Sequence, residues 1–564
     1  MLAPLFMMVE VAMDLSQPKL LQSIIDVGLP KHNLAFITHT GIVMIIVALI
    51  GFVGGSGCTL FSTIAALNFG TAIRGKLFTK VERLSFGNLD RLETGGLITR
   101  ITNDVDQVQE TMIMFLRVLV RAPLLSIGAL ILAIVTSPKL SLLLLVIAPL
   151  LITLLLVVHR KAHPLFTKLQ ERLDRVNSIV QENLAGVRVV KAFIRSDYES
   201  NRFGGANENL CTGTVQAFSV VNVIMPGMML LLNIGIVGVL WFGGVSVHRG
   251  ELHVGQVLAF ISYLLQMLSS LMMVGMLLMR VARAEASAER IAEVLDSEPE
   301  VKDGPEAISA PKLKGRVVFD HVGFKYNGSD DAAVIRDVSF TAEPGQTIGI
   351  LGATGTGKSS LVHLIPRLYD VTEGNILIDG VDIRNVTQES LRRQIAIVMQ
   401  NTILFSGTIW ENLRYGRSEA TDEEIEEAAQ MAQAHDFIMS FPDGYNTVLG
   451  QGGVNLSGGQ KQRLSIARAL VSRPSILILD DCTSAVDMAT EAKIISALNT
   501  WQHRCTRFVI AQRISAVAGA DEILVIDNGA LAGKGTHDEL LESCAVYQGI
   551  VQSQLGSREV DHGC

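Results

Sequence analysis

The sequence predicts a two-part protein, in which an α-helical membrane domain precedes a soluble α/β domain. Of the 564 residues, 49% are hydrophobic and only 18% are charged, and the mean hydropathy is +0.38, which is unusual for a soluble enzyme of this length. The apolar residues are concentrated in the first half, whereas the second half alternates short β-rich runs with helices. The chain is also too long for one hydrophobic core, so two or more domains are expected.

Six membrane spans are predicted in the first half. Five uncharged runs are near or above the roughly 20 residues that cross a bilayer, and they cover residues 40–73, 122–138, 140–158, 217–247 and 254–279. The run from 122 is short, but the apolar positions of residues 112–119 extend it upstream. A sixth candidate runs from Met1 to about Leu29, where four charged residues interrupt an apolar stretch: Glu10, Asp14, Lys19 and Asp26.

Basic residues predict the orientation of the spans. They gather in the two longest connections, residues 74–100 and 160–202, whereas the other connections hold little beyond Lys31, Lys139 and Arg249. Because cytoplasmic loops carry an excess of lysine and arginine, both long connections and everything after the sixth span are expected in the cytoplasm. The net charge of −8 and the lack of a dominant basic stripe indicate no nucleic-acid partner. The six scattered cysteines show no metal-ligand spacing and indicate reduced thiols.

The change of pattern after the sixth span sets the expected boundaries. The span continues as a charged amphipathic helix and then breaks in SEPEVKDGPEAISAPKLKG, which is rich in proline, glycine and charge. Strand-like runs such as RVVFDHVGFKY, TIGILG, ILILD and EILVIDNG follow and alternate with helices, as in a soluble α/β domain. We expect a membrane domain over 1–295, a linker over 296–314 and an α/β domain over 315–564.

The string GATGTGKSS predicts a phosphate-binding loop. It follows the strand TIGIL and precedes the helix SLVHLIPRLY, which is the structural context that such a loop requires. Its glycines let the backbone N–H groups surround phosphates, Lys358 is expected to reach the β- and γ-phosphates, and the Ser359 hydroxyl is expected to bind Mg²⁺. The loop comprises Gly352, Ala353, Thr354, Gly355, Thr356, Gly357, Lys358, Ser359 and Ser360.

Two carboxylates, Asp480 and Asp481, follow the apolar run that ends at Leu479. A carboxylate at a strand tip is often ordinary surface structure. Beside a phosphate loop, however, Asp480 is a natural partner for the same Mg²⁺ ion. Downstream of the loop stands LSGGQKQR, and SAVD follows the two aspartates. The loop, LSGGQ, ILILDD and SAVD, in this order and after six spans, resemble the ATP-binding-cassette (ABC) family over essentially the whole chain.

The resemblance implies an ABC exporter half-transporter, with a six-helix transmembrane domain fused to an α/β P-loop nucleotide-binding domain that uses ATP and Mg²⁺. It implies that Tyr326 stacks on adenine, that Gln400 senses Mg²⁺ and that Asp487 lies at a dimer interface. It also implies that the signature contacts the γ-phosphate of the partner's nucleotide, through Leu456, Ser457, Gly458, Gly459 and Gln460. Helical pieces near residues 86–90 and 182–193 match coupling helices, which favours a docking role for them over solvated extensions.

Two positions depart from the family pattern. Asp481 stands where the family has its catalytic glutamate, and Gln512 in VIAQRIS stands where it has a switch histidine. Aspartate has one methylene fewer, and misplacing a catalytic group by about 1 Å can cost about 10²-fold in rate. Glutamine can donate a hydrogen bond to a γ-phosphate but cannot carry a proton as histidine can. The chain's own site is therefore expected to bind ATP well and to hydrolyse it poorly.

The intact LSGGQ predicts a heterodimer. In the family, each ATP site combines the phosphate loop of one chain with the signature of the other, so a homodimer of this chain would have two impaired sites. With a partner half-transporter that supplies glutamate and histidine, this chain's signature completes one competent site. The string QGGVNLSGGQ also resembles, more weakly, heterodimeric multidrug exporters of bacteria, which places the chain in a bacterial cell membrane.

Glu10 and Asp14 are one helical turn apart in an otherwise apolar span. Because charges in a membrane are costly, they are expected to face a central cavity or to be paired. They predict either a site for lipophilic cations, or a structural pair with a Lys or Arg of the partner, or a protonated acid.

The predicted function is ATP-driven efflux of lipophilic, cationic drugs or lipid-like hydrophobic compounds across the bilayer. A homodimeric lipid flippase and a nucleotide-gated regulator or channel are the alternatives. The substitutions at Asp481 and Gln512 count against a homodimeric flippase. A regulator or channel would be compatible with impaired ATP sites, because nucleotide binding could open it without hydrolysis.

Overall fold

The computed structural model describes residues 2–326 and 333–555, without the side chains of residues 275, 276, 278, 279, 282 and 555. Residue 1 of the first expected span and residues 556–564 of the expected α/β domain lie outside this part of the chain. The chain divides into two compact units. One unit comprises Met1–Lys80 and Gly95–Asp296, and the other comprises Val81–Thr94 and Ser297–Cys564.

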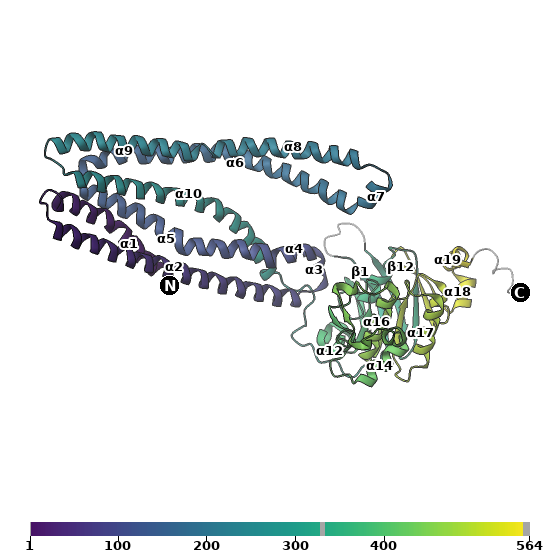
Figure 1. Cartoon of the computed structure of the whole chain (residues 1–564). Coiled ribbons are helices and arrows are strands. Elements are labelled where there is room, and N and C mark those ends of the chain that lie inside the picture. The colour runs from purple at the N-terminus through teal and green to yellow at the C-terminus, as the bar shows by residue number, and fades with distance from the viewer. Residues whose placement is uncertain (1, 327–332, 556–564) are drawn as a thin grey trace. The chain divides into compact units, whose positions relative to one another are not determined.

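The first unit is a bundle of long helices (Figure 1). Five helical segments are long and apolar enough to cross a membrane, namely Leu34–Arg83, Thr94–Thr136, Pro138–Ala185, Ser196–His248 and Val254–Val274. The sixth helix is α1, whose charged residues lower its hydropathy. The helices are α1 (Leu2–Ser23), η1 (Ile24–Gly28), α2 (Leu34–Arg83), α4 (Thr94–Thr99), η2 (Arg100–Asp104), α5 (Val105–Thr136), α6 (Pro138–Ala185), α7 (Val187–Ala192), α8 (Ser196–Val221), α9 (Ile224–His248) and α10 (Val254–Asp296).

The fourth uncharged run, residues 217–247, is not one continuous helix. Helix α8 ends at Val221 and α9 begins at Ile224, with two turn residues between them. The break, at residues 222 and 223, lies within one turn before Pro226, which has no N–H to donate to the carbonyl of Asn222. The missing hydrogen bond favours an interruption at this point of the apolar stretch.

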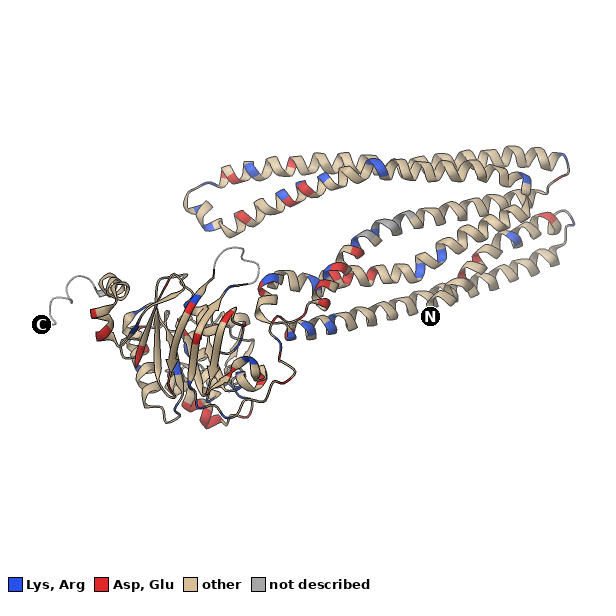
Figure 2. Cartoon of the chain, turned by 180° about the vertical axis from the view of Figure 1, so that it is seen from behind, with Lys and Arg blue, Asp and Glu red and all other residues tan. Residues whose placement is uncertain are grey.

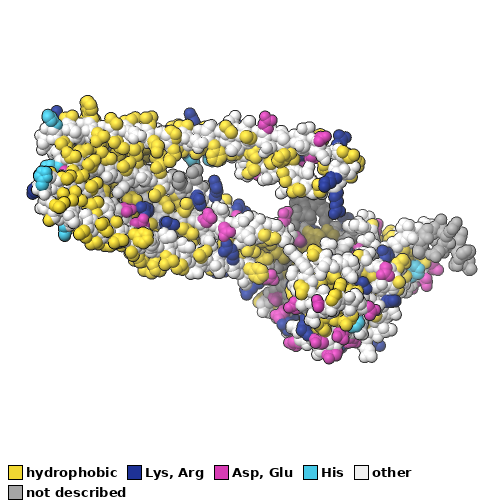
Figure 3. All heavy atoms as spheres, in the orientation of Figure 1, with side chains coloured by type: hydrophobic (Ala, Val, Ile, Leu, Met, Phe, Trp, Pro, Cys, Tyr) yellow, Lys and Arg dark blue, Asp and Glu magenta, His cyan; other side chains and the backbone are white. Residues whose placement is uncertain are grey.

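Buried apolar side chains hold the helices of the first unit together. Phe260, Tyr263 and Leu264 of α10 are almost fully buried and belong to one cluster with residues of α5, α6 and α9. The Tyr263 hydroxyl donates a hydrogen bond to the carbonyl of Leu15 on α1, at 3.2 Å. Apolar side chains also cover much of the visible outer surface of these helices (Figure 3), as expected for helices that face lipid.

Charged side chains are unevenly distributed along these helices. Figure 2 shows many charged residues toward one end of the long helices and fewer along the opposite halves. At the charged end, the buried carboxylate of Asp104 accepts hydrogen bonds from Arg290 Nε at 2.8 Å and Ser287 Oγ at 2.9 Å. Asp104 ends η2 and both partners lie on α10, so this contact ties α5 to α10 where the chain leaves the apolar region.

The second unit is built on a six-stranded sheet with the strand order β12-β11-β3-β10-β9-β6. Five adjacent strands, from β11 to the edge strand β6, are parallel, and only β12 is antiparallel to its neighbour β11. The strands are β3 (Thr347–Leu351), β6 (Ile395–Val398), β9 (Ile476–Asp480), β10 (Thr506–Ile510), β11 (Glu522–Asp527) and β12 (Ala530–Gly535). Strand β9 is buried at all five positions, which explains the unbroken apolar run ILIL.

An antiparallel sheet with the order β2-β1-β4-β5 packs beside the parallel sheet in one apolar core. Its strands are β1 (Val317–Phe324), β2 (Ile335–Ala342), β4 (Glu373–Ile378) and β5 (Val381–Asp382), and β7 (Gly407–Thr408) pairs with β8 (Val448–Leu449). The α-helices of this unit are α3 (Phe86–Leu92), α11 (Lys358–His363), α12 (Gln388–Arg392), α13 (Ile409–Arg414), α14 (Asp422–Met431), α15 (His435–Met439), α16 (Gly458–Val471), α17 (Met488–Thr500), α18 (His537–Ser543) and α19 (Ala545–Leu555).

The segment expected to be a linker is hydrogen-bonded to the second unit. The Ile308 N–H donates to the carbonyl of Asn385 at 3.0 Å, and the Thr387 N–H donates to the carbonyl of Ile308 at 2.9 Å. The carboxylate of Asp303 accepts a further bond from the Gln388 N–H at 3.0 Å. Although its composition is that of a linker, its backbone groups find partners on the surface of this unit.

Candidate functional site

The carboxyl ends of neighbouring parallel strands bring the expected site residues together. The phosphate loop follows β3, Gln512 follows β10, Asp480 and Asp481 lie at the end of β9, and Gln400 follows β6. Because β3, β10, β9 and β6 are adjacent in this order, their ends form one edge. In open α/β sheets this edge is where ligands bind.

Left-handed backbone shapes the phosphate loop. Gly355 and Gly357 have φ angles of 85° and 95°, and a Cβ on Gly357 would lie 2.8 Å from the carbonyl oxygen of Val334. The Lys358 ammonium lies over the loop and donates to the carbonyls of Gly352 at 2.9 Å and Ala353 at 2.7 Å. Burial lowers the pKa of Lys358, and the nearby carboxylates of Asp480 and Asp481 oppose that shift.

The donor set beside the loop suits a magnesium ion. Ser359 Oγ donates to Asp480 Oδ1 at 2.9 Å, and Asp480 is buried, which raises the pKa of its carboxyl. A hydroxyl, a carboxylate and the Gln400 amide offer the oxygen ligands that Mg²⁺ prefers. Within residues 2–326 and 333–555, no cluster of three or more His, Cys, Asp or Glu side chains could hold a metal alone. A magnesium ion here would therefore also need the phosphate oxygens of a nucleotide.

The two substituted positions contact each other directly. Gln512 Nε2 donates to Asp481 Oδ2 at 2.8 Å, and Gln400 Nε2 donates to the same oxygen at 3.3 Å. Asp481 has a φ of 46°, and its N–H is bonded to the carbonyl of Ile510 at 3.0 Å, so strand β10 fixes where its short side chain starts. Burial, and then the charge of Asp480, raise the pKa of Asp481.

The signature begins helix α16 and packs against the SAVD segment of the same chain. Ser457 caps the helix: its Oγ accepts from the Gln460 N–H at 3.3 Å, and its own N–H donates to Gln460 Oε1 at 2.9 Å. Gln462 holds the neighbouring segment, because its Oε1 accepts from the Ala485 N–H at 3.0 Å. Ser457 itself is exposed, so its free face remains available to a partner.

Asp487 caps the following helix, α17. Its Oδ1 accepts from the Thr490 N–H at 2.9 Å, and the bonds to backbone N–H groups and to Thr490 lower the pKa of this exposed carboxyl. Among the described residues, no hydrogen bond joins the signature or Asp487 to the chain's own phosphate loop.

Tyr326 and Tyr369 connect the phosphate-loop helix to α3. The hydroxyls of Tyr326 and Ser360 are 2.8 Å apart, and the rings of Tyr326 and Tyr369 are edge-to-face with centroids 5.2 Å apart. The Tyr369 hydroxyl in turn donates to Asp90 Oδ2 on α3 at 2.7 Å. Burial, and then the bond to Asp90, raise the pKa of Tyr369. Sequence reasoning missed Tyr369, because no motif contains it.

Replacing Tyr369 by phenylalanine is expected to uncouple transport from ATP hydrolysis. The change removes the bond to Asp90, worth about 1.5–3 kcal/mol when the partner is charged, but keeps the ring packing. We expect transport per ATP to fall several-fold, while hydrolysis changes by less than about twofold, measured in proteoliposomes. Tyr445→Phe is the matched control, because that buried hydroxyl bonds to His435 elsewhere in the same unit. Equal effects of the two variants would contradict a coupling role.

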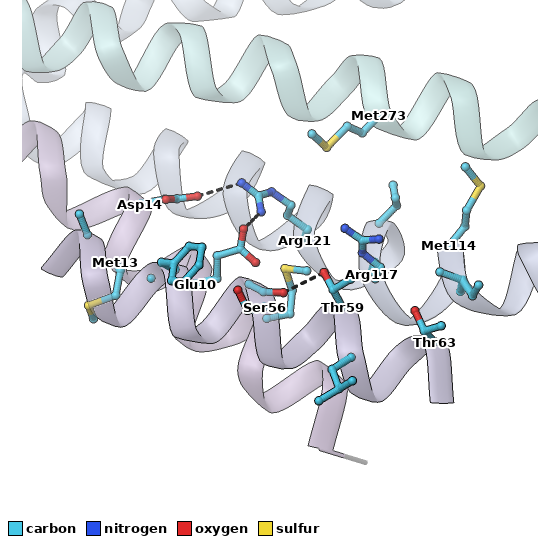
Figure 4. A pocket seen from close by; sticks show the side chains of 18 of the residues that line it. Glu10, Met13, Asp14, Ser56, Thr59, Thr63, Met114, Arg117, Arg121 and Met273 are labelled. Carbon is cyan, nitrogen blue, oxygen red and sulfur yellow. Dashed lines mark hydrogen bonds and ion pairs between the residues drawn. The ribbon is translucent and has the colours of Figure 1, made fainter. Parts of the chain in front are cut away.

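In the first unit, Glu10 and Asp14 share one cation (Figure 4). Arg121 on α5 forms an ion pair with Glu10 and another with Asp14, the latter at 2.9 Å. A pair with a partner's Lys or Arg was one expectation, but the arginine belongs to this chain. The sequence carried a signal for it that was overlooked: Arg117 and Arg121 are also one helical turn apart, beside the third apolar run.

Comparison with known proteins identifies the family. The ABC transporter transmembrane region matches residues 1–271, and the ABC transporter domain matches residues 335–484. YfiB, an ABC transporter ATP-binding protein of Bacillus subtilis, is 44% identical over 563 residues, which cover 100% of this chain and 97% of YfiB. This chain belongs to the ABC transporter family. It is an ABC exporter half-transporter, a multi-pass membrane protein whose second unit is an ATPase domain coupled to transport.

Two further proteins are similar to this chain. A solved structure of a bacterial Atm1-family ABC exporter with ATP bound has a TM-score of 0.83 and 26% identity, and the match covers 98% of each chain. A fatty acid ABC transporter ATP-binding/permease protein of Mycobacterium bovis is 38% identical over 475 residues, which cover 84% of this ABC exporter half and 75% of that protein. The six-helix membrane domain and the ABC nucleotide-binding domain predicted from the sequence are thereby confirmed.

Proposed function

We propose that this chain is the catalytically weak half of a heterodimeric ABC exporter in a bacterial cell membrane, with its ATP-binding domain in the cytoplasm. One observation carries the proposal: Asp481 and Gln512, which replace the family's glutamate and histidine, bond to each other at 2.8 Å. Around them, Lys358, Ser359 and Asp480 keep the arrangement that binds phosphate and metal. Such a site keeps the groups that bind ATP but lacks the glutamate and histidine that would move a proton during hydrolysis. It is therefore expected to retain ATP rather than to hydrolyse it.

In this site the chain's own residues bind and orient the nucleotide. The loop N–H groups and Lys358 would hold the phosphates, Tyr326 would stack on adenine, and Ser359, Gln400 and Asp480 would hold Mg²⁺, which neutralises phosphate charge. Asp481 is a poor base here because its carboxylate reaches less far than glutamate. The amide of Gln512 can orient that carboxylate but cannot accept a proton from it.

The proposed cargo is a hydrophobic, lipid-like compound. The likeness to a fatty acid ABC transporter supports this class. The expectation of cationic drugs rested on two unpaired acids, whereas Arg121 binds both Glu10 and Asp14. The acid pair therefore gives the cationic class no support.

The test compares the full-length chain alone with the chain co-purified with the second half-transporter from its own cells. We expect the chain alone to retain radiolabelled ATP and to hydrolyse it about 10²-fold more slowly than the pair does, because its own base is displaced. A self-assembled chain that turns over ATP as fast as the pair, with Asp481 and Gln512 unchanged, contradicts the proposal.

A further inference from the structure

A cavity of about 1360 Å³ lies inside the first unit, among helices α1, α2, α5 and α10. Six charged residues line it: Glu10, Asp14, Glu110, Arg117, Arg121 and Arg280. Arg121 is paired with Glu10 and Asp14, and Arg280 Nη1 is 3.1 Å from Glu110 Oε2. These contacts account for all three acids of the lining.

Arg117 is the cation of this lining that has no partner. Within residues 2–326 and 333–555, its guanidinium makes no ion pair and no hydrogen bond. It lies one turn before Arg121 on α5, and its side chain is exposed to the cavity (Figure 4). An arginine in an apolar helix is costly, so an unpaired one indicates a function.

Hydroxyl groups accompany Arg117. Ser56, Thr59 and Thr63 line the cavity from α2, at spacings of three and four residues that place them on one face of the helix. Thr59 donates to the carbonyl of Gly55 at 2.9 Å, whereas Ser56 and Thr63 make no hydrogen bond among the described residues, so their O–H groups are available. A guanidinium with nearby hydroxyls is a donor set for carboxylate or phosphate oxygens.

Apart from Gln17, most of the remaining wall is apolar and adaptable. It includes Met13 of α1, Phe52 and Leu60 of α2, Ile113 and Met114 of α5, and Met273 of α10. Methionine side chains adjust to differently shaped partners and so suit chains of varying length. In the part of the chain that the structure describes, the cavity thus combines one free cation, Arg117, with an apolar lining.

We propose that this cavity binds a single-chain amphiphile with an oxyanion headgroup, either carboxylate or phosphate, and that Arg117 selects for the headgroup. Either Ser56 or Thr63, which are two turns apart on α2, donates to the same oxygens, and the tail lies along the methionine-rich wall. The inference rests on the proposed export of lipid-like compounds and names the charge of the cargo. It also reverses the sign expected from Glu10 and Asp14 alone.

The experiment is equilibrium binding of tritiated palmitate to the full-length chain in neutral phosphatidylcholine nanodiscs, without nucleotide. Competitors share its sixteen-carbon tail: hexadecyl phosphate, hexadecanol and hexadecyltrimethylammonium. We expect hexadecyl phosphate to displace palmitate. Hexadecanol and hexadecyltrimethylammonium should need at least tenfold higher concentrations to displace the same fraction of palmitate. Because ATP hydrolysis is not measured, failure of the heterodimer proposal leaves this result unchanged.

Arg117→Gln is expected to weaken palmitate binding at least tenfold, and Arg117→Lys less, because lysine keeps the charge but loses the planar fork. Lys139→Gln is the control, because Lys139 is an exposed cation outside the cavity, paired with Glu251 at 2.8 Å. ATP binding by each variant checks that it is folded. Unchanged palmitate binding in folded Arg117→Gln overturns the proposal. The proposal is also overturned if hexadecyltrimethylammonium binds more tightly than palmitate and the double variant Glu10→Gln with Asp14→Asn abolishes that binding. That result would instead support a site for cations.

Discussion

Replacing Ser457 by arginine in this chain is expected to reduce ATP hydrolysis by the assembled transporter at least 10²-fold. Ser457 is exposed at the start of α16, so a long side chain fits the isolated chain but would occupy the place of the partner's γ-phosphate. By contrast, Lys358→Ala should lower hydrolysis only a few-fold, because it damages a site that contributes little turnover. The measurement is steady-state phosphate release by the co-purified pair.

Thr421→Arg provides a matched control for Ser457→Arg. Thr421 is likewise an exposed cap of a helix, α14, in the same kind of reciprocal pair, here with Glu424. Both substitutions lose about 1 kcal/mol of capping stability, but only Ser457 is proposed to face a nucleotide. A larger loss from Lys358→Ala than from Ser457→Arg would reverse the proposed division between the two sites.

The double variant Asp481→Glu with Gln512→His is expected to raise ATP hydrolysis by the chain alone at least tenfold. Glutamate moves the carboxylate outward by one methylene, and histidine supplies a group that can hold a proton. Each single variant should gain less, because Gln512 and Asp481 share one hydrogen bond and act together. Phosphate release by the purified, full-length chain is the measurement.

Adding Lys358→Ala to this double variant should cancel the gain, because the restored pair then has no well-held phosphate to act on. Retention of labelled ATP checks that the double variant still binds nucleotide. If it binds ATP but hydrolyses it no faster than the original chain, the loss of activity lies elsewhere than in these two residues.

The nucleotide site could be predicted from sequence because its parts are local. The motifs that contain Lys358, Gln400, Asp480 and Gln512 each follow a strand of one parallel sheet, so the strand ends bring these four residues to one edge. What the motifs leave open is which atoms meet. The bond between Gln512 and Asp481 joins side chains 31 residues apart, and it depends on the register of β9 and β10.

The membrane cavity was less predictable because its contacts join distant helices. Glu10 and Arg121 are 111 residues apart, and hydropathy finds the spans without revealing which faces meet. Charge spacing was the usable signal, since acids and arginines each recur after one turn. Tyr369 could not be found in this way, because its role depends on a bond to Asp90, 279 residues away.

The hydrogen-bonded segment before β1 changes where the ATPase domain begins. A fragment cut at Arg316 would leave the carbonyl of Asn385 and the N–H groups of Thr387 and Gln388 without the chain that satisfies them. Excision at Ser297 keeps those partners. The smallest ATPase fragment that keeps its hydrogen bonds is therefore longer than the strand pattern suggests. The segment whose composition resembles a linker forms part of the surface of this domain.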